Sequence, residues 1–123
     1  MCGIIGITSS KPVSSAIINS LRKLEYRGYD SAGLATLSGG IINEVKSEGR
    51  VENLEKNIAI KNMQGSVGIG HVRWATHGIP NTVNAHPHSS NNVSIVHNGI
   101  FENSTILKKF LISKIASPER FIN

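Results

Sequence analysis

The 123-residue sequence is poor in several features, and each shortage excludes a class of protein. Its single cysteine, Cys2, excludes an internal disulfide framework and a cysteine-rich metal site. It has no apolar run long enough to span a bilayer and no positively charged opening segment, so we expect neither a membrane protein nor a signal peptide. The expected compartment is therefore the cytosol, without a membrane partner.

The charge of the chain gives little support for a nucleic-acid partner. Thirteen Lys and Arg residues stand against eight Asp and Glu residues, which gives a formal net charge of +5. These basic residues are scattered, and the sequence contains neither a basic run nor a recognisable nucleic-acid motif. We therefore expect no nucleic acid as partner. Aromatic residues make up only 5% of the chain, but a hydrophobic content of 39% fits one small soluble domain.

Hydrophobic periodicity predicts a chain of mixed helices and strands. Apolar residues recur at helical spacing from Val13 to Tyr26, and similar patterns predict helices over 51–62 and 104–115. Residues 77–92 are expected to form a loop. Short β-rich runs predict five strands, over 3–9, 33–37, 40–47, 66–74 and 93–98. A Gly-Gly turn at 39–40 joins the second and third of them. This pattern indicates the α+β class or a layered sandwich.

The position of Cys2 is the first chemical clue. If Met1 is removed, as is usual before a small residue, Cys2 carries both a thiol and a free α-amine. The reference pKa is about 8.5 for a thiol and about 7.7–8.0 for an α-amine, so the amine is partly neutral and can take the thiol proton. One residue then supplies both nucleophile and base. Taken alone, the position also fits a buried apolar cysteine at the start of a strand.

An acyl-transfer site also needs hydrogen-bond donors for the oxygen of its tetrahedral intermediate. Asn98 and Gly99 follow the last predicted strand, where they offer a side-chain amide and an uncovered backbone N–H. A plain Asn-Gly turn is the alternative interpretation of the same two residues.

The segment HVRWATHG, residues 71–78, offers contacts for a small substrate. Arg73 can hold a carboxylate with two parallel hydrogen bonds, and Trp74 can shield a site from water. Thr76 and His77 can bind other polar groups. In the alternative interpretation, Trp74 belongs to the core, Arg73 to a surface ion pair and His77 to an exposed loop.

A metal module is a third hypothesis, because the chain has five histidines. They are His71, His77, His86, His88 and His97. No cysteine ligand is available to complete a zinc site of the usual composition. We therefore expect no metal and no other cofactor.

Five motifs occur in one order along the chain, and together they carry a family resemblance. They are CGIIGI (2–7), LEYRGYDSAG (24–33), HVRWATHG (71–78), NAHPH (84–88) and VHNGIFEN (96–103). This set resembles the glutaminase domain of the glutamine–fructose-6-phosphate aminotransferase family, within the class II glutamine amidotransferases. The resemblance implies the αββα sandwich of N-terminal nucleophile hydrolases.

The resemblance also implies a reaction that needs no cofactor. Cys2 would attack the side-chain amide of glutamine, ammonia would leave, and water would release glutamate from the thioester. Asn98 and Gly99 match the oxyanion-hole residues of the family, and Arg27 matches a residue close to the catalytic cysteine. Glutamine is therefore the expected small-molecule partner.

Further matches concern the binding of glutamine. Arg73 matches the clamp on the α-carboxylate. Trp74, Thr76 and His77 match the wall of the glutamine site and its contacts. His86 lies in a family motif, and the resemblance gives it no defined role.

The resemblance covers 2–114, the expected N-terminal part of a class II glutamine amidotransferase domain, and it fails in a divergent tail at 115–123. There the family has a Ser-Glu-Thr-Asp-Thr-Glu motif whose aspartate holds the α-amino group of glutamine, whereas this chain reads IASPERFIN. We also expect the sugar isomerase domains of the family to be absent. We therefore predict an incomplete sandwich with impaired glutamine hydrolysis. An inactive truncated remnant is the alternative.

An incomplete sandwich would leave strand edges and apolar faces uncovered. We expect such edges at 3–7, 33–37, 66–72 and 93–98, where other chains can associate.

Overall fold

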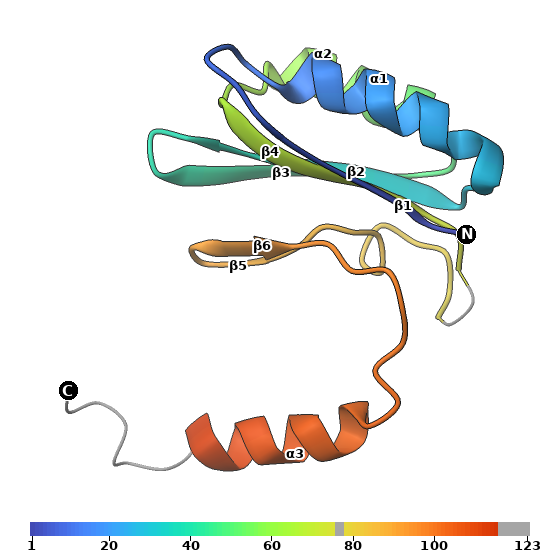
Figure 1. Ribbon diagram of the computed structural model, residues 1–123, viewed down its shortest axis with the longest axis vertical. Coiled ribbons are helices and arrows are strands. Elements are labelled where there is room, and N and C mark those ends of the chain that lie inside the picture. The colour runs from blue at the N-terminus through green and yellow to red at the C-terminus, as the bar shows by residue number, and fades with distance from the viewer. Residues whose placement is uncertain (76–77, 116–123) are drawn as a thin grey trace.

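The structure is built on one four-stranded antiparallel sheet with the order β1–β4–β2–β3 (Figure 1). The computed structural model describes residues 1–75 and 78–115, apart from the side chains of 58–61. The sheet consists of β1 (Gly3–Thr8), β2 (Ser31–Ser38), β3 (Ile41–Glu48) and β4 (Val67–Arg73). These strands confirm four of the predicted ones, although β2 begins two residues earlier than expected. The predicted turn is also present, with Gly39 and Gly40 both at positive φ.

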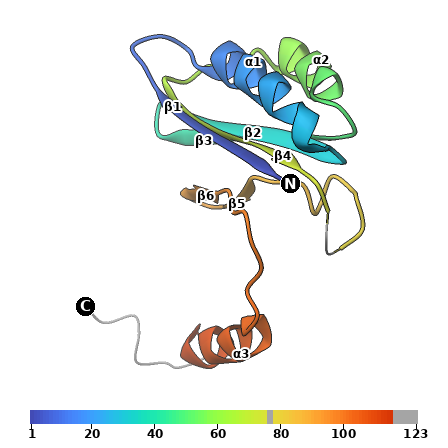
Figure 2. The same ribbon diagram turned by 45° about the vertical axis from the view of Figure 1, so that its right-hand side comes forward.

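Two helices cover one face of this sheet (Figures 1 and 2). They are α1 (Ser14–Leu24), which continues into the 3₁₀ turn η1 (Glu25–Arg27), and α2 (Val51–Lys61). Both predicted helices are confirmed. Their apolar residues meet the inward side chains of the sheet in a core formed by Val13, Ile17, Ile18, Leu21, Ala32, Leu34, Val45, Val51, Leu54, Met63 and Val72.

Strand β4 shows how the two faces of the sheet are divided. Gly68 and Gly70 lie under α1, so close that a side chain at either position would collide with Ile17. Because side chains alternate along a strand, His71 and Arg73 face the opposite side. Both are buried there, because the segments that contain His86 and Asn98 cover that end of the sheet. This second face carries the polar site described below.

A thinner layer lies against the second face. It contains a two-stranded sheet of β5 (His88–Ser90) and β6 (Val93–Ile95), and α3 (Ser104–Ile115) follows in the chain beyond this layer. The predicted helix at 104–115 is confirmed. The prediction of a loop across 77–92 is wrong for β5, because Ser89 pairs in register with Ser94. The strand predicted to reach residue 98 already ends at Ile95.

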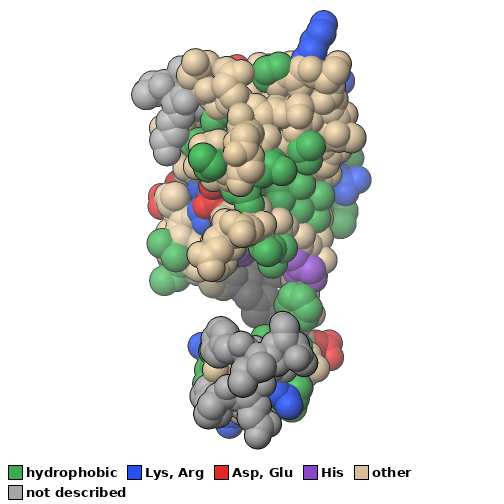
Figure 3. Space-filling view, turned by 90° about the vertical axis from the view of Figure 1, so that its left-hand side faces the viewer, with side chains coloured by type: hydrophobic (Ala, Val, Ile, Leu, Met, Phe, Trp, Pro, Cys, Tyr) green, Lys and Arg blue, Asp and Glu red, His purple; other side chains and the backbone are tan. Residues whose placement is uncertain are grey.

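Helix α3 stands apart from the rest of the protein. It has no buried residue, and Figures 1 and 2 show it below the two sheets, at the level of the separate lower mass in Figure 3. The layers therefore follow the predicted αββα order, but they fall short of a full sandwich, as expected. None of the described helices has the length and apolar character that crossing a bilayer requires.

The prediction of open strand edges is only partly right. Strands β2 and β4 are interior strands with a partner on each side, so the expected edges at 33–37 and 66–72 do not exist. The edges of the large sheet are β1 and β3. Apolar side chains do remain exposed on the second face, at Ile4, Leu37 and Val67.

Candidate active site

A pocket of about 550 Å³ opens where the start of β1, the end of β4 and the segment after β6 meet. Most of the residues singled out in the sequence line it, although they come from distant parts of the chain. The lining consists of Met1, Cys2, Arg27, His71, Arg73, Trp74, Ala75, His86, His97, Asn98, Gly99 and Ile100. Thr76 and His77 lie outside the described residues.

Cys2 reaches this pocket because β1 pairs antiparallel with β4. The register places Gly3 opposite Val72, so Cys2 lies beside the residues that leave β4. The Trp74 backbone N–H donates to Sγ at 3.3 Å, and Sγ lies 3.5 Å from the Trp74 carbonyl oxygen. The thiol is partly exposed. It therefore lies at the pocket wall and not in the core.

Asn98 approaches Cys2 from the segment after β6. Its Nδ2 donates to the backbone carbonyl of Cys2 at 3.3 Å, although the two residues are 96 positions apart. Its Oδ1 lies 2.8 Å from Nε2 of His71. Gly99 follows with φ at +137°, a conformation that residues with a side chain rarely adopt. Asn98 therefore does more than form a turn, because it contacts both Cys2, just before β1, and His71 of β4.

Arg73 is held by Asp30, the residue before β2. Its guanidinium lies 3.5 Å from Asp30 Oδ1, and only 8% of Arg73 is exposed. The same carboxylate accepts hydrogen bonds from Ser31 Oγ at 2.8 Å and from the backbone N–H of Ala75. The interpretation of Arg73 as a surface residue is therefore wrong, since the pair is buried in the site.

Trp74 and Arg27 form the side of the pocket near η1. Trp74 is 49% exposed, so the interpretation of it as a core residue is wrong. Its indole lies over Gly28, where a Cβ would come within 2.5 Å of Cε3. The Arg27 side chain donates to the Tyr26 hydroxyl at 3.2 Å, and its carbonyl accepts from the Met1 ammonium at 3.0 Å.

Three histidine rings form a row, and two of them, His71 and His86, line the pocket. The rings of His71 and His86 are stacked at 4.4 Å, and His88 meets His86 edge-on at the same distance. Burial, together with the neighbouring His71 and His88, lowers the pKa of His86 to about 4. Burial also lowers the pKa of His71, although its hydrogen bond to Asn98 acts in the opposite direction. These rings are therefore neutral near pH 7.

The row of rings is not a metal centre in this structure. Within residues 1–75 and 78–115, no group of three or more His, Cys, Asp or Glu side chains is arranged to hold a metal ion.

Two site residues were missed by sequence reasoning. Asp30 had no assigned role, and His71 was considered only as a metal ligand. The spacing of His71 and Arg73 could have revealed His71, because residues two apart on a strand share a face. Asp30 gives a weaker signal, since nothing local predicts that it meets β4.

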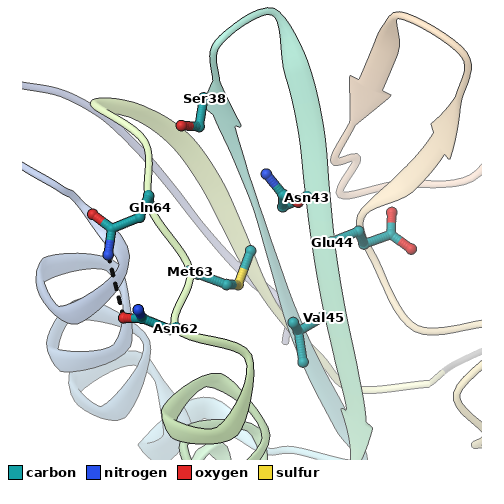
Figure 4. Close-up of a pocket in the computed structure, with 7 residues that line it drawn as sticks. All are labelled: Ser38, Asn43, Glu44, Val45, Asn62, Met63 and Gln64. Atoms are coloured by element: carbon teal, nitrogen blue, oxygen red, sulfur yellow. Dashed lines mark hydrogen bonds between the residues drawn. The ribbon is translucent and has the colours of Figure 1, made fainter.

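A second pocket, of about 400 Å³, lies between the β2–β3 hairpin and the end of α2 (Figure 4). Its lining consists of Ser38, Asn43, Glu44, Val45, Asn62, Met63 and Gln64. It holds no nucleophile paired with a base. Its carboxylate, Glu44, points away from Met63 in Figure 4 and pairs with Lys46 at 3.4 Å. The pocket around Cys2 is therefore the better candidate for chemistry.

Comparison with known proteins supports this choice. No protein-family model matches the chain. It is 50% identical over 117 residues to glutamine–fructose-6-phosphate aminotransferase (isomerizing) of Agrobacterium fabrum, covering 95% of this chain and 19% of that protein. The protein of the same name from Clostridium acetobutylicum is 53% identical over 116 residues, with 93% and 19% covered. The chain thus spans about a fifth of the length of these relatives.

Solved structures agree on the fold. Glutamine phosphoribosylpyrophosphate amidotransferase from B. subtilis, complexed with ADP and GMP, aligns with a TM-score of 0.76 and 28% identity. A structure described as the allosteric regulatory enzyme of purine biosynthesis aligns with a TM-score of 0.78 and 29% identity. Each alignment covers 95% of this chain and 26% of the other. The resemblance predicted from the motifs is confirmed: the chain is similar to about one fifth of glutamine–fructose-6-phosphate aminotransferase and has the fold of an N-terminal nucleophile amidotransferase.

Proposed function

We propose that this chain hydrolyses the side-chain amide of glutamine, with Cys2 as the nucleophile after removal of Met1. One observation carries the proposal: Cys2, Asn98 and Gly99 line one pocket, and the amide nitrogen of Asn98 lies 3.3 Å from the backbone of Cys2. A thiol beside a fixed amide donor is what acyl transfer requires.

Removal of Met1 would change the pocket in two ways. Met1 is 76% exposed and lines the pocket, and its ammonium is hydrogen-bonded to the Arg27 carbonyl. Its loss would take a side chain out of the pocket. It would also turn the nitrogen of Cys2 into a primary amine, which can act as the base for the thiol of the same residue.

The reaction then proceeds in two balanced steps. The amine of Cys2 takes the thiol proton while Sγ bonds to the amide carbon, and the carbonyl oxygen becomes an oxyanion. Asn98 Nδ2 and the Gly99 N–H donate to this oxygen. The C–N bond breaks, the leaving nitrogen takes the proton from the amine, and ammonia departs from a glutamyl thioester. Water attacks the thioester, which frees glutamate and restores the thiol.

The charge of the pocket fits one end of glutamine better than the other. Its lining contains Arg27 and Arg73 and, among the described residues, no Asp or Glu. We assign the α-carboxylate of glutamine to Arg73, which Asp30 holds in place. Trp74, Thr76, His77 and His86 complete the proposed wall. The α-ammonium finds no described carboxylate in this lining, so we expect slow hydrolysis.

Glutamate release from glutamine by the purified chain tests the proposal, and mass spectrometry of the same sample reports whether Met1 has been removed. We expect release from the processed chain and none from Cys2→Ala. Asn98→Ala should lower kcat by about 10²–10³-fold, the usual cost of one oxyanion donor. A processed, folded chain without glutamate release would overturn the proposal in favour of an inactive chain.

Two glutamine analogues test the assignment of the substrate ends. Glutaramate lacks the α-amino group, whereas 4-aminobutanamide lacks the α-carboxylate. We expect glutaramate to be hydrolysed about as well as glutamine, and 4-aminobutanamide to lose most of the rate because it offers Arg73 no substrate carboxylate to bind. The opposite order would contradict the assignment of Arg73.

The proposal is limited to residues 2–114 as the N-terminal part of a glutaminase domain. The divergent tail begins at residue 115, and residues 116–123 lie outside the described part of the chain. Amination of fructose 6-phosphate is not proposed. A cytosolic location and association through exposed apolar surface remain part of the proposal, and cell fractionation and light scattering test them.

A further inference from the structure

The buried imidazole of His71 is in hydrogen-bond contact with Asn98, the proposed oxyanion donor. Only 1% of His71 is exposed, and its Nε2 lies 2.8 Å from Oδ1 of Asn98. Its ring stacks on that of His86 at 4.4 Å, with 26° between the ring planes. His71 does not touch Cys2 in any hydrogen bond of the described residues, so it acts on the nucleophile's surroundings through Asn98.

The orientation of the Asn98 amide depends on which nitrogen of His71 carries the hydrogen. Nδ2 of Asn98 donates to the Cys2 carbonyl, and this places Oδ1 toward His71. An oxygen can only accept, so Nε2 of His71 must donate. With the hydrogen on Nδ1 instead, Nε2 would become an acceptor. The amide would then turn over and present its oxygen to Cys2, where a developing oxyanion would be repelled.

The other ring nitrogen agrees with this assignment. Nδ1 of His71 is buried without a hydrogen-bond partner among the described residues. A buried N–H without a partner is rarer and more costly than a buried acceptor without one. The hydrogen therefore belongs on Nε2, where Asn98 receives it. The lowered pKa of His71 keeps the ring neutral, so a single hydrogen is available for this choice.

We propose that His71 is a positioning residue that fixes the Asn98 amide with its NH₂ group toward Cys2. The neutral ring donates from Nε2 to Oδ1, and the stacked ring of His86 holds its plane. This inference rests on the proposed function, because the direction of the NH₂ group matters only where an oxyanion forms.

The tautomer is tested without turnover. Long-range ¹H–¹⁵N correlation spectra of the full chain, assigned with His71→Gln, report the protonation of each ring nitrogen at neutral pH. We expect His71 to be neutral with its hydrogen on Nε2. We also expect a nuclear Overhauser effect between this Nε2 hydrogen and the side-chain NH₂ hydrogens of Asn98. A ring with its hydrogen on Nδ1, or a doubly protonated ring, would overturn the inference whether or not the chain is active.

Kinetics test the consequence. His71→Leu removes the group that donates to Asn98. It should lower kcat for glutamine by about 10–100-fold and change KM by less than about 2-fold, because the orientation of the Asn98 amide matters mainly in the transition state. His71→Gln can place an amide N–H near the same point and should recover most of the loss. His88→Gln is the matched control, because its ring packs on His86 without reaching Asn98, and its kcat should be unchanged.

The outcomes separate the two proposals. Equal losses in His71→Leu and His71→Gln, with both variants folded by circular dichroism, would show a merely structural role and overturn the positioning role. A wild-type chain with the Nε2–H tautomer but no glutamate release would overturn the proposed function and leave the geometry of Asn98 intact.

Discussion

The two sides of the large sheet differ in how they are covered. On one side, α1 and α2 bury an apolar core in which Ile17, Leu21 and Leu54 are fully enclosed. On the other side, the described chain places the short β5–β6 sheet and the segments before and after it against the strands, and α3 stands free with Phe110 and Leu111 exposed. The helical side therefore carries the stability of the fold.

The candidate site lies between these two sides. Arg73 ends β4 and Cys2 directly precedes β1, two strands anchored in the helical core, whereas Asn98 and His86 come from the thinner layer. The proposed nucleophile is thus fixed by the well-packed half, and its proposed oxyanion donor is supplied by the other half. Contacts across this boundary, such as the one between His71 and Asn98, decide whether the site is assembled.

The largest effect should separate two leucines. Leu21→Ala removes a fully buried side chain of α1 and should lower the free energy of unfolding by about 2–5 kcal/mol. Leu111→Ala removes the same atoms from α3, where Leu111 is 55% exposed. This substitution should change the free energy of unfolding by less than about 0.5 kcal/mol. Urea unfolding followed by circular dichroism in dilute solution measures both. Similar losses would mean that α3 is packed as tightly as α1.

The helical side is also the part that sequence reasoning predicted well. Helical spacing from Val13 to Tyr26 and the Gly-Gly turn at 39–40 are local signals, and both elements appear where expected. The end of the last strand was misplaced, and β5 was taken for loop, because such short strands depend on pairing with each other. A strand of three residues is too short to show the alternating periodicity by which a strand is predicted.

The site shows the same division between local and distant signals. Cys2 and Asn98 were predicted because each carries recognisable chemistry and lies in a motif. Asp30 and His71 were missed because their roles come from contacts across 43 and 27 positions of sequence. Trp74 was open to two interpretations, and its exposure and its place in the pocket lining decide between them.

An intermediate effect should arise where the two sides touch. Gly33 of β2 lies under the backbone of His86, and a Cβ there would come within 2.2 Å of the His86 carbonyl oxygen. Gly33→Ala should lower the free energy of unfolding by about 1–3 kcal/mol or push His86 away from His71. The NMR signals of the His71 ring would report such a displacement. Gly6→Ala on β1 is the matched control, because a Cβ there meets nothing within 4 Å. A Gly33 variant as stable as the Gly6 variant, with an unchanged His71 spectrum, would contradict this contact.

The smallest effect should come from acid, and it should act on the row of histidine rings. In the folded chain the pKa of His86 is about 4, against an ordinary value of 6.5, and those of His71 and His88 are also lowered. Between pH 6.5 and 4 the unfolded chain therefore binds protons that the folded chain does not. By linkage, the stability contributed by the neutral rings is complete above pH 6.5 and is lost as the pH falls through this window.

His86→Gln should flatten this part of the pH dependence. The difference in unfolding free energy between the wild type and the variant, measured at several pH values from 7 to 4, should shrink as the pH falls, because only the wild type has a ring to protonate. The half-buried ring is partly screened by water, so the change should be smaller than that for Leu21 or Gly33. A difference that stays constant over this range would show that the thinner layer does not shield His86 from solvent, and that the two sides of the sheet are held together by other contacts.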